Sequence, residues 1–89
     1  MSMDDQYQQM KIFAATLRDF NEHLGASVND LRQNHDNVSP FWQDQMRKKY
    51  DAVWGPFEEK MKHYLERESS NYEEFLEVKL QALKRYLEG

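Results

Sequence analysis

The stretch DNVSPFWQDQM, residues 36–46, contains the clearest interruption in this chain of 89 residues. Asparagine, aspartate, serine and proline are typical of turns and helix caps. Ser39 has the character of a helix N-cap, and Pro40 that of a first helical residue, where its missing N–H costs nothing. We therefore expect a loop over residues 35–39 and a helix that begins at Pro40.

The segment before this loop carries large apolar residues at steps of three or four, which is the pattern of one helix face. They are Met3, Tyr7, Met10, Phe13, Leu17, Phe20, Leu24, Val28 and Leu31. We expect a helix over residues 3–34. Gly25 lies inside it and should cost about 1 kcal/mol relative to alanine. Either a close approach by another backbone or a mild bend would explain so small a residue there.

The segment after the loop has a regular spacing of eleven residues. Three apolar series follow it: Tyr50, Met61, Tyr72 and Leu83; Trp54, Leu65, Leu76 and Leu87; and Val53, Tyr64, Phe75 and Tyr86. Eleven residues make three turns of about 3.67 residues each, so such a stripe barely winds around its helix. The spacing predicts one nearly straight helix over residues 40–88, about 70 Å long.

Two features interrupt this second helix. Gly55 and Pro56 lie inside it, and an internal proline removes a backbone hydrogen bond and crowds the preceding turn. Because the apolar spacing keeps its phase across Pro56, we expect a kink there rather than a break. Ser70 and Glu73 have the spacing of a capping box, which would start a third helix.

These patterns predict an all-α fold, an antiparallel helical hairpin with a long second helix. If the shorter first helix covers the second only as far as Tyr72, a line of leucines stays exposed: Leu76, Leu80, Leu83 and Leu87. We predict that they bind a partner hairpin, which would complete a four-helix bundle. The alternative is a three-helix bundle, in which residues 71–88 fold back over their own apolar face.

The composition indicates a single helical domain over residues 1–89. Apolar residues make up 39% and charged residues 31%, as in folded soluble chains. The formal net charge is −4 and cysteine is absent, which argues against a nucleic-acid surface and excludes a disulfide framework. No secretory leader or membrane span is recognisable. We expect a cytoplasmic protein, and any export would proceed without a signal peptide.

No motif for catalysis stands out. The three histidines, His23, His35 and His63, are scattered along the chain. Acidic residues four positions before two of them are typical of solvent-exposed helix pairs rather than of metal ligands. There is no phosphate-binding loop and no nucleophile motif. The sequence therefore predicts a non-enzymatic chain without a cofactor or metal.

A small, cysteine-free helical hairpin with a tryptophan at its turn resembles the WXG (Trp-x-Gly) family of type VII secretion systems. Trp42 stands in the place of the family tryptophan, whereas Asp44 stands where the family has glycine. The resemblance implies a secreted protein or a partner of one, which forms a homodimer or a heterodimer with a related hairpin. Secretion machinery or an exported toxin are further implied partners. Tyr64 and Glu68 have the spacing of the family's Tyr-x-x-x-Asp/Glu motif, but they lie within the second helix.

Phe41 and Trp42 directly follow the expected loop, although turns usually carry small polar residues. One interpretation packs them against the end of the hairpin core, near Val28 or Leu31. The other makes them part of a partner-binding surface. Besides a role in secretion, the same architecture suits a cytoplasmic adaptor, a chaperone-like partner or an accessory subunit of an enzyme.

Overall fold

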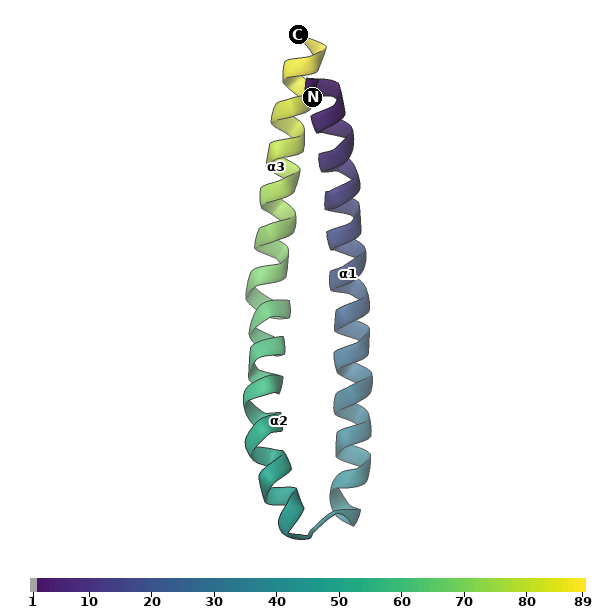
Figure 1. The fold of residues 1–89 in the computed structure, drawn as a ribbon, viewed down its shortest axis with the longest axis vertical. Helices are drawn as coiled ribbons and strands as arrows, with labels where there is room; N and C mark the ends of the chain where they lie inside the picture. Colours follow the sequence, from purple (N-terminus) through teal and green to yellow (C-terminus); the bar gives the residue numbers. More distant parts are fainter. Residues whose placement is uncertain (1) are drawn as a thin grey trace.

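The computed structural model describes residues 2–89 and consists of two antiparallel helical arms (Figure 1). The first arm is α1, Met3–Val38. The short 3₁₀ turn η1, Ser39–Phe41, begins the connection to the second arm. That arm stacks α2 (Gln45–His63), the π-helical turn η2 (Tyr64–Glu68) and α3 (Ser69–Glu88) end to end.

The hairpin is a rod of 65 × 20 × 16 Å with both termini at the same end (Figure 1). The predicted all-α helical hairpin is therefore confirmed. The alternative three-helix bundle is wrong, because α3 continues the direction of α2 instead of folding back. The π-helical turn η2 widens the helix locally, and the direction of the second arm stays the same.

The connection between the arms lies further along the chain than the loop expected over residues 35–39. Residues 35–38 stay helical, and the backbone N–H of Ser39 still donates to the carbonyl of His35. Pro40 lies in η1 rather than at the start of the second helix. That helix starts at Gln45, because Asp44 has extended backbone and its side chain accepts a hydrogen bond from the N–H of Arg47.

The face of α1 that packs against the second arm repeats every seven residues, as in a coiled coil. Its buried and half-buried residues are Tyr7, Met10, Ala14, Leu17, Asn21, Leu24, Val28 and His35. We call this line of contacts the seam. Phe13 and Phe20 were expected on this face, but they are 54% and 55% exposed. Their neighbours Ala14 and Asn21 occupy the seam instead, about 100° further around the helix.

Two of the three series spaced by eleven residues supply most of the second arm's side of the seam. Tyr50, Trp54, Met61 and Leu65 are half-buried, and Leu76 and Leu83 are buried. Three members of the third series face outward, since Val53, Phe75 and Tyr86 are 72%, 73% and 69% exposed. The fourth, Tyr64, is half-buried. The sequence pattern was thus two adjacent stripes on one helix rather than a single broad core face.

The second arm runs through Gly55 and Pro56 without a break, because both lie inside α2. The departure from regular α-helix comes later, at η2. The predicted capping box does not form. The hydroxyl of neighbouring Ser69 donates to the carbonyl of Leu65 at 2.9 Å, and no side chain caps the start of α3.

The first helix covers the second arm further than the sequence suggested. α1 has 36 residues, and its N-terminal part lies beside α3 (Figure 1). Leu76 and Leu83 are only 9% and 4% exposed within the single chain. The expectation that these two leucines are left uncovered is therefore wrong. Leu80 is half-buried and Leu87 is partly exposed near the end of the arm.

Gly25 offers a direct test of how closely the arms pack. A Cβ atom built on Gly25 meets nothing within 4 Å, so no other backbone requires a glycine there. We expect Gly25→Ala to stabilise the hairpin by about 0.5–1 kcal/mol, because alanine is the better helix former. Thermal or chemical unfolding monitored by circular dichroism measures this change. A loss of stability would mean that the arms approach more closely at this position than the structure shows.

Candidate interaction surface

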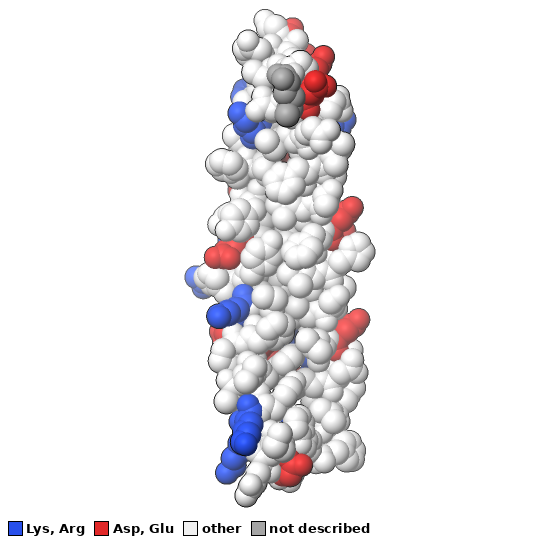
Figure 2. Space-filling model, viewed as in Figure 1, with Lys and Arg blue, Asp and Glu red and all other residues white. Residues whose placement is uncertain are grey.

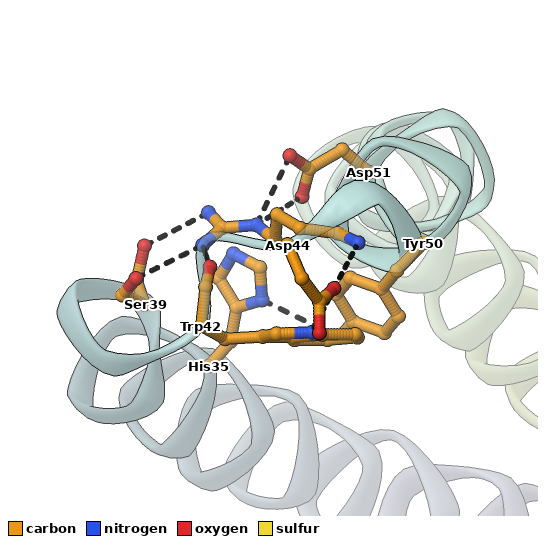
Figure 3. Close-up of polar contacts among 7 residues, drawn as sticks. His35, Ser39, Trp42, Asp44, Tyr50 and Asp51 are labelled. Carbon is orange, nitrogen blue, oxygen red and sulfur yellow. Dashed lines mark hydrogen bonds and ion pairs between the residues drawn. The ribbon is translucent and has the colours of Figure 1, made fainter.

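The connection between the arms is held by one arginine (Figure 3). Arg47 donates from its guanidinium to the carbonyl and the hydroxyl of Ser39, at 3.0 and 2.8 Å, and to the carbonyl of Trp42 at 3.0 Å. Its Nε also donates to both carboxylate oxygens of Asp51, at 2.9 and 3.0 Å. The Ser39 carbonyl also accepts from the backbone N–H of Trp42 at 3.4 Å. Because Arg47 binds the carbonyls of Ser39 and Trp42 at once, it fixes the path of the turn.

Aromatic rings close the hairpin beside this arginine. Trp42 packs on Tyr50 with ring centroids 5.0 Å apart. His35 stacks on Trp54 at 4.6 Å and lies 3.3 Å from the hydroxyl of Tyr50. The seam of α1 thus reaches the turn, and this stacking explains why residues 35–38 remain helical.

The two aromatic residues at the turn have different surroundings. Trp42 is half-buried, and its indole N–H donates to the carboxylate of Asp44 at 2.9 Å. Phe41 is 88% exposed and caps no part of the core. The packing interpretation therefore fits Trp42, although its partners are Tyr50 and Asp44 rather than Val28 or Leu31. It does not fit Phe41, which remains a predicted partner-binding residue.

A long uncharged face runs along the hairpin (Figure 2). In that view most of the Lys, Arg, Asp and Glu side chains lie along the edges, and most of the middle is uncharged. α1 contributes Phe13, Phe20, Leu31 and Val38, which are all exposed and are separated by steps of 7, 11 and 7 residues. Such steps return to nearly the same side of a helix.

The second arm contributes the outward series to the same face. Val53 and Phe75 each precede a seam residue, as Phe13 and Phe20 do on α1. In an antiparallel pair of right-handed helices, positions just before the seam residues lie on one common side of the pair. Val53, Phe57, Phe75 and Tyr86, which are all exposed, therefore join the α1 residues in one surface, here called the uncharged face.

The opposite side of the hairpin carries the ion pairs that join its arms. Arg18 reaches Glu73 and Glu77, at 3.5 and 3.6 Å, and Arg32 reaches Glu58 at 3.6 Å. A shallow groove of about 300 Å³ lies near Arg18, and Lys11 and Lys84 line it. The ion pairs that join the arms thus lie away from the uncharged face.

The predicted partner-binding residues do not form one surface. Phe41 and Trp42 lie at the turn, whereas Leu76, Leu80, Leu83 and Leu87 lie far along the second arm, mostly on the seam. Sequence reasoning missed the uncharged face because it assigned Phe13 and Phe20 to the core. The steps of 7 and 11 residues that link the exposed residues of α1 were the available signal.

Within residues 2–89 we find no group of three potential metal-ligating side chains. Among the same residues, no helix is long and apolar enough to cross a bilayer.

Comparison with protein families decides what kind of hairpin this is. The sequence model for "proteins of 100 residues with WXG", WXG100, matches residues 2–67, which include α1, the turn and α2. The chain belongs to the WXG100 family. Comparisons with curated proteins and with solved structures gave no match.

Membership of WXG100 makes the chain a small helical protein related to type VII secretion, and it confirms the resemblance drawn from the turn tryptophan. Proteins of the WXG100 family typically pair with helical partners. The departure at Asp44 has a structural counterpart, since its carboxylate both caps α2 and holds the indole of Trp42. A glycine could do neither.

Proposed function

We propose that the chain acts as a non-enzymatic pairing protein of a type VII secretion system and is exported as a folded pair. The observation that carries this proposal is the uncharged face. Its residues include five that are more than half exposed: Phe13, Phe20, Val53, Phe75 and Tyr86. Monomeric soluble proteins rarely leave so continuous an apolar surface open to water.

The partner that we propose is a second copy of the chain. The edges of the uncharged face carry side chains of both signs (Figure 2), so a copy laid against it meets no uniform like charge. Two hairpins joined in this way would form a four-helix bundle with the phenylalanines of both chains in its centre. A related hairpin of different sequence is the alternative occupant, because the same face would fit its apolar residues.

In this arrangement the turn stays outside the pairing face. Phe41 and Trp42 lie at the end of the rod, where the Arg47 network holds the backbone in one conformation. A preorganised aromatic surface loses less entropy on binding. We propose that this end of the pair contacts the secretion machinery, with Phe41 as the exposed contact and Trp42 as its support.

Export can be tested in cells that carry a type VII secretion system. We expect the chain to accumulate in the culture medium, and to stay in the cells when the membrane ATPase of the system is inactivated. Phe41→Ala should reduce the exported amount without changing the melting temperature, since Phe41 packs on no part of the core. Equal amounts in the medium with and without the ATPase, or none in either, would contradict the proposal.

A further inference from the structure

A buried polar residue sits near the middle of the seam. Asn21 is 7% exposed and occupies a heptad position that would normally hold an apolar side chain. Its amide oxygen accepts a hydrogen bond from the Tyr64 hydroxyl at 2.7 Å, and its amide nitrogen donates to a Glu73 oxygen at 3.1 Å. Arg18 approaches the other oxygen of Glu73 at 3.5 Å. The side chain of Asn21 thus has a partner at both ends.

The π-helical turn makes this arrangement possible. Tyr64 and Glu73 are nine residues apart, which in a regular α-helix is about 2.5 turns and places them on opposite sides. The turn η2, Tyr64–Glu68, begins at the first of the two. A π-helical turn takes about one residue more than an α-helical turn. The nine residues therefore come closer to two whole turns, and both side chains face α1.

The same turn changes the pattern of the second arm. Before η2, the seam follows the spacing of eleven residues, from Tyr50 to Met61. After it, Ser69, Leu76 and Leu83 are buried at steps of seven, which matches the heptads of α1. The π-helical turn is thus the place where two different periodicities are joined, and Asn21 lies opposite it.

We propose that Asn21 and the π-helical turn form a register lock that aligns the two arms. Only one alignment lets Asn21 meet Tyr64 and Glu73 together. That alignment places the Phe13 and Phe20 side of α1 beside the Val53 and Phe75 side of the second arm. Asn21 is therefore a positioning residue, because it aligns the two arms whose side chains form the uncharged face. Its importance for pairing rests on the proposed function. The lock itself belongs to the single chain.

Replacing the lock with an apolar side chain separates alignment from stability. Asn21→Leu continues the apolar heptads of α1, so the helical content should be kept and the melting temperature should be equal or higher. Leucine fits several alignments, however, because a shift by one heptad again places apolar residues opposite each other. Such a shift moves the arms by about 10 Å relative to each other, and it requires the turn held by Arg47 to rearrange.

The alignment can be measured by pulsed electron paramagnetic resonance, because the chain has no cysteine that would take an unwanted label. Spin labels on cysteines introduced at the exposed positions Gln8 and Lys79 report the distance between the arms. An excess of unlabelled protein removes signals between chains, so the result does not depend on pairing.

We expect one narrow distance for the parent chain and a second or clearly broadened population for Asn21→Leu. Tyr64→Phe, which removes one of the two hydrogen bonds, should broaden the distribution as well. Tyr72→Phe is the matched control and should leave it unchanged, since the Tyr72 hydroxyl has no hydrogen-bond partner within residues 2–89. Should Asn21→Leu fail to fold, Tyr64→Phe decides alone. A single narrow distance in every folded variant would overturn the register lock while leaving the proposed function intact.

Discussion

Replacing Leu76 and Leu83 together with aspartate should unfold the hairpin, not merely separate two hairpins from each other. Both leucines are buried against α1 within one chain, at 9% and 4% exposure. Truncating a buried leucine usually costs about 2–5 kcal/mol, and burying an unpaired carboxylate adds to that cost. Two such changes are comparable to the whole stability of a small domain, about 5–15 kcal/mol. Circular dichroism should show loss of the helical signal.

Phe75→Asp combined with Tyr86→Asp is the matched control. These residues lie on the same helix, but they are 73% and 69% exposed. The control adds the same two charges to positions that already face water, so the helical signal should survive. A double leucine variant that keeps its helices and melts like the control would show that α1 does not cover this part of the second arm.

Two charges on the uncharged face should abolish pairing and preserve the fold. Phe20→Glu and Phe75→Glu place one carboxylate on each arm, at positions 55% and 73% exposed in the single chain. In a pair of hairpins these carboxylates would be buried without a partner charge. We expect the dissociation constant of the pair to rise at least about a hundredfold, which corresponds to about 2.7 kcal/mol. Sedimentation velocity over a range of concentrations measures the change.

The control for this variant adds the same charge to the opposite side. Ala15→Glu and Gln81→Glu change exposed residues beside the groove that Lys11 and Lys84 line. Association should be nearly unaffected, because that side faces away from the proposed partner. Equal weakening by both double variants would point to a general effect of charge and against the uncharged face.

The sequence was sufficient to predict the hairpin and the passage of the second helix through Pro56, because both depend on periodicity over many residues. It misplaced the turn by several residues. Ser39 and Pro40 have the residue types of a helix start. In the structure, however, the Ser39 hydroxyl accepts a hydrogen bond from the Arg47 guanidinium, and Asp44 caps the N-terminus of α2. Contacts across the turn, between residues three and eight positions apart, decided between two chemically reasonable caps.

The seam was harder to predict for a related reason. At Phe13–Ala14 and at Phe20–Asn21, hydrophobicity favours the phenylalanine for the core, and the structure places the smaller neighbour there. Close packing of two helices favours small residues at the contact, and Asn21 has its two polar partners on the facing arm. Those partners come together only through the π-helical turn, for which the sequence carried no recognised signal.

The mass of the wild-type protein in solution tests the central claim most directly. Light scattering coupled to size-exclusion chromatography, at micromolar concentrations and above, should give twice the 10.8 kDa of one chain. That result is expected because the uncharged face needs a second hairpin to cover it. A chain that remains at 10.8 kDa over the whole range, with its helices intact, would contradict pairing through a second copy.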